Sequence, residues 1–412
     1  MILREEDGAD DPEGSPEHWE HIARELADDL AVDAPERDRA GRPPVEEMAR
    51  VHESGLLTAL APPTPEGGGL AWPFAFRIVR RLAAADSSIA ELLGRHYVLS
   101  WSGRLLLPTD RGLSWEAHTV GPGRLLAGET GSGADTDRAM DDPLTVTADD
   151  RGYNLSGRSA LVPGALVADR IVLSARRAGT GGSRAVLLVD PSDTAVTLDP
   201  VDHLLGQRLT GSGTLTFDHL EVSENQVLGS VAGDEHLAPP ITALVPLALR
   251  MMTAHVVLGI AEGALAEARD ATLITSHAHS SARRRHDPEP LTTGPDPDLL
   301  QTYGELAAAA HVAATVVEHA THALTDGVLR GRELDAEECS RIAVSVATAE
   351  ATAGESALHI TGRVLELVDA ADMDRFWRNT RTLTTRRSPA RRLRAIGEHF
   401  LYAARPVHAL GA

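Results

Sequence analysis

Hydrophobic spacing changes twice along this 412-residue chain, and that order limits the folds available to it. From about residue 16 to 107 apolar residues recur at helical spacing, and Ser15 with Pro16 is a predicted helix start. Short alternating runs typical of strands follow at 144–147, 171–174, 185–189 and 214–217. Helical spacing returns after Gly229. The sequence therefore predicts an α+β chain with an N-terminal α-helical domain (16–118), a middle β-barrel or sandwich (119–230) and a C-terminal four-helix bundle (231–412).

The C-terminal third carries the clearest helical signals. Apolar residues from Leu299 to Leu324 are spaced alternately four and three apart, which is a seam that requires a partner helix. Asp335, with Glu338 three residues later, predicts a capping box at the start of another helix. The intervening stretch 280–298 is rich in Arg, Pro and Asp and is predicted to be a loop.

Composition narrows the class of protein. The formal net charge is −21, and an acidic surface repels nucleic acid and anionic lipid, so we expect neither as a partner. The single cysteine, Cys339, excludes an internal disulfide framework and a Cys-based zinc cluster. Residues 1–15 are acidic and are predicted to be disordered, without a signal peptide. The apolar stretch 240–266 contains Arg250 and Glu262 and predicts a buried helix of a cytoplasmic protein.

Three segments together resemble one family. They are 205–214 (LGQRLTGSGT), 296–306 (DPDLLQTYGEL) and 374–382 (DRFWRNTRT). Their order and content resemble the flavin-dependent monooxygenases of acyl-CoA dehydrogenase fold, the group that contains dibenzothiophene and alkyl-sulfone monooxygenases. The resemblance extends from about residue 20 to 405 and implies an acyl-CoA dehydrogenase-like fold. It also implies a small-molecule substrate, a flavin cofactor (FMN or FAD) supplied in reduced form by a separate flavin reductase, and a homotetramer.

The resemblance also implies a flavin site between the sheet and the C-terminal helices. The loop 128–135 (GETGSGAD) would bring Gly128, Glu129, Thr130 and Ser132 to the flavin, although a flexible loop is the simpler interpretation. The strand 156–164 would bring Val162, Pro163 and Gly164 to the ring. The family commonly has a hydroxyl and an amide N–H at position 163, and proline supplies neither.

The segment Gly94-Arg95-His96-Tyr97 resembles a family segment whose histidine faces flavin and substrate. Histidine exchanges a proton near neutral pH, so His96 is the predicted catalytic acid–base group. Ser100 lies one helical turn later and is predicted to share its pocket. The alternative is a histidine and a serine with structural roles only.

The third segment departs from the family at two positions. The family usually continues with two histidines, and here those positions hold Leu383 and Arg386, neither of which exchanges protons at working pH. Arg378 and Arg381 remain as candidate contacts to a flavin phosphate or to a neighbouring subunit, or as a solvated charged face. Arg283 is a further candidate for the flavin phosphate, or part of a mobile charge cluster.

Three functions stay open at this point. The first is an oxygen-inserting flavin enzyme acting on a small aromatic, heteroatom-containing or specialised-metabolite substrate. The second is a flavin-dependent acyl-CoA dehydrogenase, for which the C-terminal motif shows no glutamate base. The third is a flavin-free catalyst or binding protein, which Pro163, Leu383 and Arg386 keep open. Metal ligands at a convincing spacing are not found.

Overall fold

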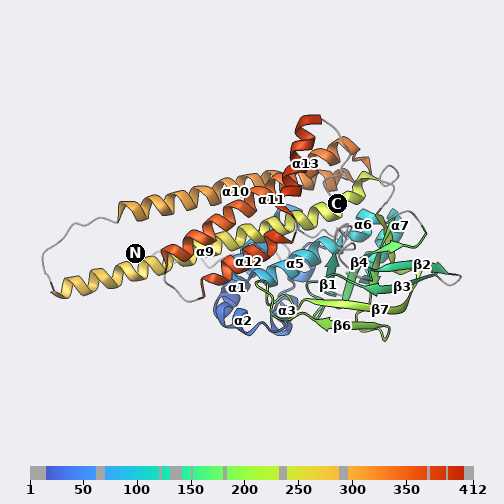
Figure 1. The fold of residues 1–412 in the computed structure, drawn as a ribbon, viewed down its shortest axis with the longest axis horizontal. Helices are drawn as coiled ribbons and strands as arrows, with labels where there is room; N and C mark the ends of the chain where they lie inside the picture. The colour runs from blue at the N-terminus through green and yellow to red at the C-terminus, as the bar shows by residue number, and fades with distance from the viewer. Residues whose placement is uncertain are drawn as a thin grey trace, which may run out of the picture.

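The computed structural model describes residues 15–61, 70–119, 123–129, 142–149, 152–179, 183–231, 239–286, 296–368, 372–386 and 388–402. Its N-terminal part is helical (Figure 1). The helices are α1 (Pro16–Ala31), α2 (Ala34–Ala40), α3 (Val45–Glu53), the 3-10 helix η1 (Leu56–Thr58), α4 (Trp72–Ala85), α5 (Ser87–Ser100), α6 (Ser102–Leu106) and α7 (Thr109–Thr119). The predicted start of α1 is confirmed, because the Ser15 hydroxyl accepts a 3.1 Å hydrogen bond from the His18 N–H.

A sheet follows. Its strands are β1 (Leu126–Glu129), β2 (Thr145–Asp149), β3 (Gly152–Arg158), β4 (Arg170–Arg177), β5 (Arg184–Val189), β6 (Val196–Pro200), β7 (Gly213–Val222) and β8 (Val227–Val231). The strand order is β6-β7-β3-β2-β4-β5-β8, and β1 pairs with β4 off this path. The 3-10 helix η2 (Glu224–Gln226) separates β7 from β8. Within the described residues no pairing joins β6 to β8, so the order is that of an open path.

The four predicted strand runs are confirmed as parts of β2, β4, β5 and β7. The sheet is mixed, because β4 pairs in parallel with both β1 and β2 and the other pairs are antiparallel. The expected strand 156–164 is shorter than predicted, because β3 ends at Arg158. The strand β6 is largely exposed, so its residues carry no apolar alternation that could predict it.

The remaining chain forms long helices that lie side by side above the sheet in Figure 1. They are α9 (Leu244–His286), α10 (Pro297–Arg330) and α11 (Ala336–Leu367), with the 3-10 helices η3 (Pro240–Ala243) and η4 (Gly331–Glu333). The shorter α12 (Asp374–Thr385) and α13 (Pro389–Tyr402) pack against α11, and α12 also packs against α9. Asp335 and Glu338 form the predicted capping box of α11.

The helix α9 is the central element of this part. One stretch, Pro240–Thr275, is long and apolar enough to cross a membrane, but 83% of its most apolar window is buried inside the protein. Its packing against α4 is very close, because a Cβ at Gly259 or Gly263 would overlap backbone oxygens of α4. The predicted buried helix is therefore confirmed.

Two expectations about these helices need correction. The predicted loop 280–298 begins too early, because α9 continues to His286, and α10 begins at Pro297 with Asp296 as its cap. The apolar seam of α10 is buried from Leu306 to Leu324. Its partner helices, α9 and α11, belong to the same chain, so the seam by itself does not indicate a subunit contact.

Candidate active site

Two of the sequence segments that carry the family resemblance contact one another. Gly206 lies directly against the backbone of α12, where a Cβ would overlap the carbonyl of Arg378. The next residue, Gln207, has φ 57° and is fully buried, and its backbone N–H donates to Asn379 Oδ1 at 2.7 Å. Its side-chain amide donates to Ser87 Oγ at 3.1 Å, at the start of α5. The loop before β7 therefore sets the position of α12 relative to α5.

The same loop also holds the turn that precedes β4. The Gly164 N–H donates to the Thr210 carbonyl at 2.8 Å, and Val162 exchanges two backbone hydrogen bonds with Gly213. The Thr210 and Ser212 hydroxyls share a buried 2.7 Å hydrogen bond that stiffens the loop. One loop therefore positions both the sheet side and the α12 side of the space between them.

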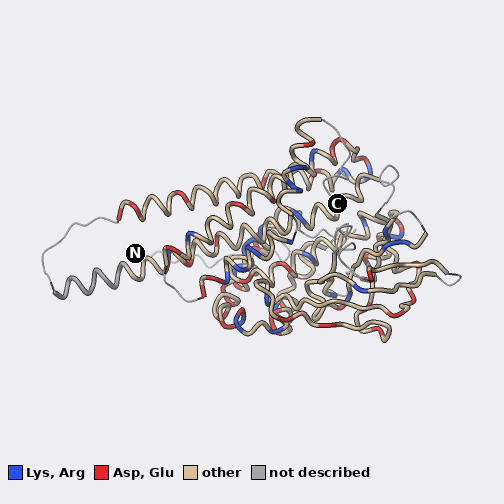
Figure 2. The backbone as a smooth tube through the Cα atoms, in the orientation of Figure 1, with Lys and Arg blue, Asp and Glu red and all other residues tan. Residues whose placement is uncertain are grey.

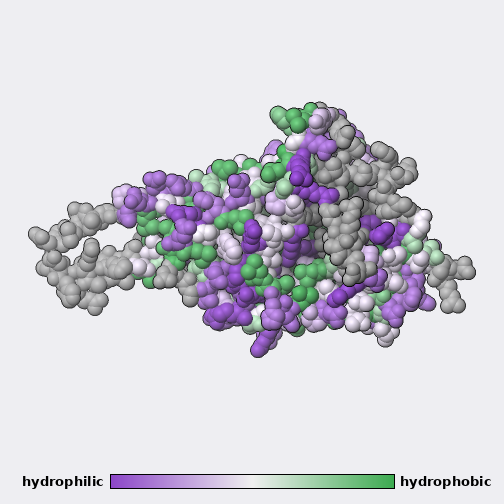
Figure 3. Space-filling model, in the orientation of Figure 1, coloured by the Kyte–Doolittle hydropathy of each residue, from purple (hydrophilic) through white to green (hydrophobic). Residues whose placement is uncertain are grey.

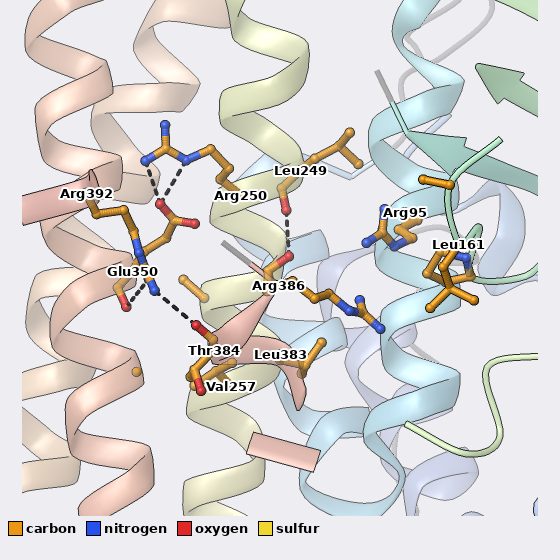
Figure 4. Close-up of a pocket in the computed structure, with 15 residues that line it drawn as sticks. Arg95, Leu161, Leu249, Arg250, Val257, Glu350, Leu383, Thr384, Arg386 and Arg392 are labelled. Carbon is orange, nitrogen blue, oxygen red and sulfur yellow. Dashed lines mark hydrogen bonds and ion pairs between the residues drawn. The ribbon is translucent and has the colours of Figure 1, made fainter. Parts of the chain in front are cut away.

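That space is a cavity of about 330 Å³ where α5, α9, α11, α12, α13 and the turn before β4 meet (Figure 4). Its volume lies at the lower end of the range of ~300–1,000 Å³ typical of small-molecule sites. Its lining is Arg95, Ala160, Leu161, Pro163, Leu249, Arg250, Thr253, Ala254, Val257, Glu350, Gly354, Leu383, Thr384, Arg386 and Arg392. The wall mixes apolar side chains with four guanidinium groups.

One end of the cavity holds a buried ion pair. Arg250 of α9 donates from Nε and Nη2 to Glu350 Oε2 of α11, at 2.8 and 2.5 Å. Both side chains are under 10% exposed, and a charge in such surroundings is stable only when it is paired. Arg392 of α13 donates to the carbonyl oxygens of Glu350 and Thr384, each at 3.2 Å. This end is therefore held by contacts among α9, α11, α12 and α13.

The other end is built around Glu91 of α5. Its Oε1 accepts from Arg95 Nε at 2.9 Å and also from Arg386 Nη1 at the end of α12. Burial alone would raise the pKa of the Glu91 carboxyl, but Arg386 and Arg95 together lower it below its usual value. Glu91 is therefore an anion that holds two guanidinium groups at the cavity wall, and Figure 4 shows Arg386 extending toward Arg95.

His96 lies on α5 outside the lining of this cavity, and its predicted acid–base role stays a prediction. Its Nε2 is 2.7 Å from the Leu57 carbonyl, and the Leu126 N–H donates to its Nδ1 at 3.1 Å. A carbonyl only accepts and an amide N–H only donates, so the ring must be neutral with its proton on Nε2. Burial lowers its pKa to about 4. In this structure His96 joins η1, α5 and β1.

Ser100 is also buried away from the cavity. Its hydroxyl donates to the Tyr97 carbonyl of its own helix at 2.7 Å, and the side chain is 1% exposed. Neither His96 nor Ser100 lines this cavity, and the pocket that they are predicted to share stays a prediction.

Most of the predicted glycine contacts are explained by backbone packing. A Cβ at Gly128 would overlap the Val172 carbonyl, so close pairing of β1 with β4 requires this glycine. Gly164 has φ +85°, a conformation that glycine adopts readily. Val162 packs in the core of the sheet, and Pro163 lines the cavity. The structure therefore brings only Pro163 of this set to the cavity.

Two of the predicted arginine contacts to flavin, Arg378 and Arg381, do not line this cavity. Arg378 forms ion pairs with Asp38 at 2.6 Å and with Asp374 at 2.8 Å, and Arg381 is exposed on α12 outside the cavity lining. Thr130, Ser132 and the side chains of Glu129 and Arg283 lie outside the described residues. Their roles stay predictions.

Sequence reasoning overlooked Arg95, Arg250, Glu350, Thr384 and Arg392 as cavity residues. A signal existed for two of them, since Arg250 and Glu350 interrupt strongly apolar helical runs and such charges are buried only in pairs. Leu383 and Arg386, noted only as departures from the family, both line the cavity. Among the residues whose side chains are described, no group of three or more His, Cys, Asp or Glu could hold a metal ion.

Comparison with known proteins shows which family the chain belongs to. No protein-family model matches the chain. A probable FMNH2-dependent monooxygenase, SfnC of Pseudomonas putida, is 31% identical over 393 residues, which cover 93% of this chain and 95% of that protein. A dibenzothiophene monooxygenase of Rhodococcus qingshengii is 28% identical over 94% of each chain.

Solved structures agree with this result. The methanesulfinate monooxygenase MsuC from Pseudomonas fluorescens has a TM-score of 0.82 and 29% identity, covering 95% of this chain and 99% of that one. FMN-bound TdsC from Paenibacillus sp. A11-2 has a TM-score of 0.81 and 27% identity, covering 96% and 100%. The likeness to these solved structures over nearly the whole chain shows an enzyme of acyl-CoA dehydrogenase-like fold. Within that fold, the chain belongs to the family of flavin-dependent monooxygenases.

Proposed function

We propose that the protein is the oxygenase component of a two-component system that takes reduced FMN from a separate flavin reductase and oxygenates a small organic molecule. The observation that carries this proposal is the cavity between α5, α9, α12 and the turn before β4. It lies in a chain whose relative SfnC is by name FMNH2-dependent and whose structural neighbour TdsC has been solved with FMN bound.

The cavity residues fit a flavin in two respects. Leu161, Pro163 and Leu383 offer an apolar wall for a flat ring, and guanidinium groups suit a phosphate through paired N–H donors. One feature fits less well, because Pro163 has no N–H to donate to the ring. We assign Leu161 and Pro163 to ring contact and Arg392 to the region of the phosphate.

Reduced flavin supplies the activation of oxygen when it is bound. The protein's own residues orient the substrate, exclude water and hold fixed charges around the reacting groups. Leu249, Val257 and Leu383 make that part of the wall apolar, so water is poorly held there. Among the described residues that line the cavity, the groups that can exchange a proton with a bound molecule are the Thr253 and Thr384 hydroxyls and the Glu350 carboxylate.

We also propose the finer organisation expected from the sequence. The sheet would act as the middle β-barrel domain (119–230), between a helical domain (16–118) and a four-helix bundle (231–412) of α9, α10, α11 and one shorter helix. A cytoplasmic homotetramer is the proposed state of the enzyme. The exposed apolar residues of the long helices support self-association (Figure 3).

Anaerobic titration tests the function. Purified protein is titrated with FMN, FAD, riboflavin and their reduced forms, and reduced FMN is expected to bind most tightly. Oxygen consumption with reduced FMN is then followed with a panel of small sulfur-containing and aromatic compounds. Binding of no flavin at high micromolar concentration would reject the proposal in favour of a flavin-free protein.

An acyl-CoA dehydrogenase activity is the second candidate, because the structure places a carboxylate, Glu350, in the cavity. Its Oε2 accepts two hydrogen bonds from Arg250, which hold the carboxylate in a fixed position. Reduction of bound oxidised flavin by butyryl-CoA or octanoyl-CoA under anaerobic conditions would support this activity. We expect no reduction, because the flavin enters the proposed reaction already reduced.

A further inference from the structure

We propose that the substrate carries an oxyanion (a carboxylate, sulfinate or sulfonate) and that Arg386 binds this group in the cavity. The inference rests on the monooxygenase function proposed above and adds the substrate class and the residue that selects it. It starts from the position of one guanidinium group at the end of α12.

Arg386 has N–H donors that no hydrogen bond to the described residues uses. Its side chain is 25% exposed and lines the cavity, and Nη1 donates to Glu91 Oε1. A guanidinium has five N–H donors, and Glu91 is its only hydrogen-bond acceptor in the part of the chain that the structure describes. The remaining donors are available to a bound molecule. Because arginine stays protonated at every working pH, this group binds anions and does not exchange protons.

Each end of the cavity carries two guanidinium groups and one carboxylate. At the α11 end Arg250 donates to Glu350, and Arg392 donates to two backbone carbonyls. At the α5 end Arg95 and Arg386 both donate to Glu91. Figure 4 shows Arg386 directed away from Glu350. An anion bound at Arg386 therefore meets a guanidinium group with further N–H donors, on the side of the cavity away from the Glu350 carboxylate.

The cavity also offers an apolar surface to the organic part of such a substrate. Leu249, Val257 and Leu383 line the same cavity, so an acid with an apolar body can place its charged group at Arg386 and its body against these side chains. Leucine at 383 and arginine at 386 are one helical turn apart on α12. The two positions together favour an amphiphilic acid over a neutral apolar molecule.

The phosphate of FMN is also an oxyanion that Arg386 could bind. The experiment therefore separates binding of the substrate's anionic group from binding of the flavin phosphate. Flavin-free protein is titrated calorimetrically with benzenesulfinate and with methyl phenyl sulfone, a neutral molecule of similar shape. The parent should prefer benzenesulfinate. Arg386→Leu should weaken benzenesulfinate binding by at least about tenfold and leave sulfone binding unchanged. The control is Arg341→Leu, an exposed arginine of α11 that pairs with Glu337, and it should behave like the parent.

Three results would overturn the proposal. Equal binding of both compounds by the parent removes the anion preference, and unchanged benzenesulfinate binding by Arg386→Leu removes the residue assignment. If Arg386→Leu instead loses the preference for FMN over riboflavin and keeps the benzenesulfinate preference, the flavin phosphate is the ligand of Arg386. A parent that binds benzenesulfinate but no flavin supports the anion site and rejects the proposed function, so the two failures are distinct.

A second variant gives a direct signal from the site. The chain contains no lysine, so Arg386→Lys introduces the only one. Lysine labelled with ¹³C at Cε then gives a single NMR resonance from the cavity wall, and a shift is expected with benzenesulfinate and not with methyl phenyl sulfone. If neither compound shifts the lysine resonance, and the variant has the parent's circular dichroism spectrum, the proposal is contradicted. This holds even if Arg386→Leu fails to fold.

Discussion

At the residue scale, His96 shows how hydrogen-bond chemistry determines protonation. Both ring nitrogens are used by backbone groups, Nε2 by the Leu57 carbonyl and Nδ1 by the Leu126 N–H. A second proton on the ring would face the Leu126 N–H, donor against donor, inside a buried site. His255 differs, because its Nε2 lies 2.8 Å from the Thr321 hydroxyl and its ring stacks on Phe76, and burial lowers its pKa to about 3.

His96→Phe should lower the free energy of unfolding by about 2–5 kcal/mol at pH 7, because two buried backbone groups lose their partner. The parent's stability should fall as the pH drops from about 6.5 to about 4, because the unfolded histidine takes up a proton that the folded one resists. His96 contributes about 3 kcal/mol of this loss, and the variant lacks that contribution. Urea titrations at several pH values measure both effects, and unchanged stability with lost turnover would support the predicted catalytic role.

Pro163 is the single predicted flavin contact that reaches the cavity. Pro163→Ser adds an N–H and a hydroxyl there, so FMN affinity should rise by about two- to tenfold, the value of one ordinary hydrogen bond. Ala160→Ser is the matched control, since it adds a hydroxyl to the same wall where an N–H already exists. FMN affinity that is unchanged in Pro163→Ser would mean that position 163 does not face the ring.

At the scale of elements, the cavity depends on the contact between the loop before β7 and α12. Gly206→Ala should destabilise the protein by about 1–3 kcal/mol and weaken FMN binding, because the new Cβ overlaps the Arg378 carbonyl and displaces α12. Gly304→Ala on α10 is the control: its Cβ would meet nothing within 4 Å, so stability should rise by about 0.5–1 kcal/mol. Thermal unfolding and FMN titration of both variants measure these effects. Equal stability and equal FMN affinity of the two variants would contradict the prediction.

Local sequence patterns predicted the helices and strands better than they predicted the residues of the cavity. The Ser15 cap, the Asp335 capping box and the four apolar strand runs depend on neighbours in sequence, and the structure has them. The cavity depends on pairs such as Arg250 with Glu350, and Glu91 with Arg386, which are 100 and 295 residues apart. Nothing in local spacing encodes such pairs. The contacts of His96 could not be predicted for the same reason, because its partners Leu57 and Leu126 lie on other elements.

At the scale of the molecule, charge and apolar surface are segregated. Basic positions recur along α12 and α13 in a chain of net charge −21 (Figure 2). The long helices α9 and α10 extend beyond the rest of the protein and carry exposed apolar side chains (Figures 1 and 3). These are Leu273, Ile274, Leu300 and Val312. Because exposed apolar residues gathered in one region mark a contact surface, we expect the extended helices to mediate self-association.

Replacing Leu273 and Ile274 together by glutamate should reduce the association state. Ile274 is 71% exposed and Leu273 50% exposed, so the monomer loses little packing, whereas an interface would have to bury two carboxylates. The nearby 2.7 Å hydrogen bond between Thr272 and Tyr303 continues to hold α9 to α10. Sedimentation velocity at micromolar concentration should show an oligomer for the parent and smaller species for the variant.

Val45→Glu is the control for added charge. Val45 is 64% exposed at the start of α3, away from the extended helices, so this variant should sediment like the parent. Raising the salt concentration should strengthen the parent's association, because screening weakens repulsion between strongly acidic copies while apolar contacts persist. A parent that sediments as a monomer at low and high salt would reject the assembly. Every site residue would then have to come from one chain, as those around the cavity do.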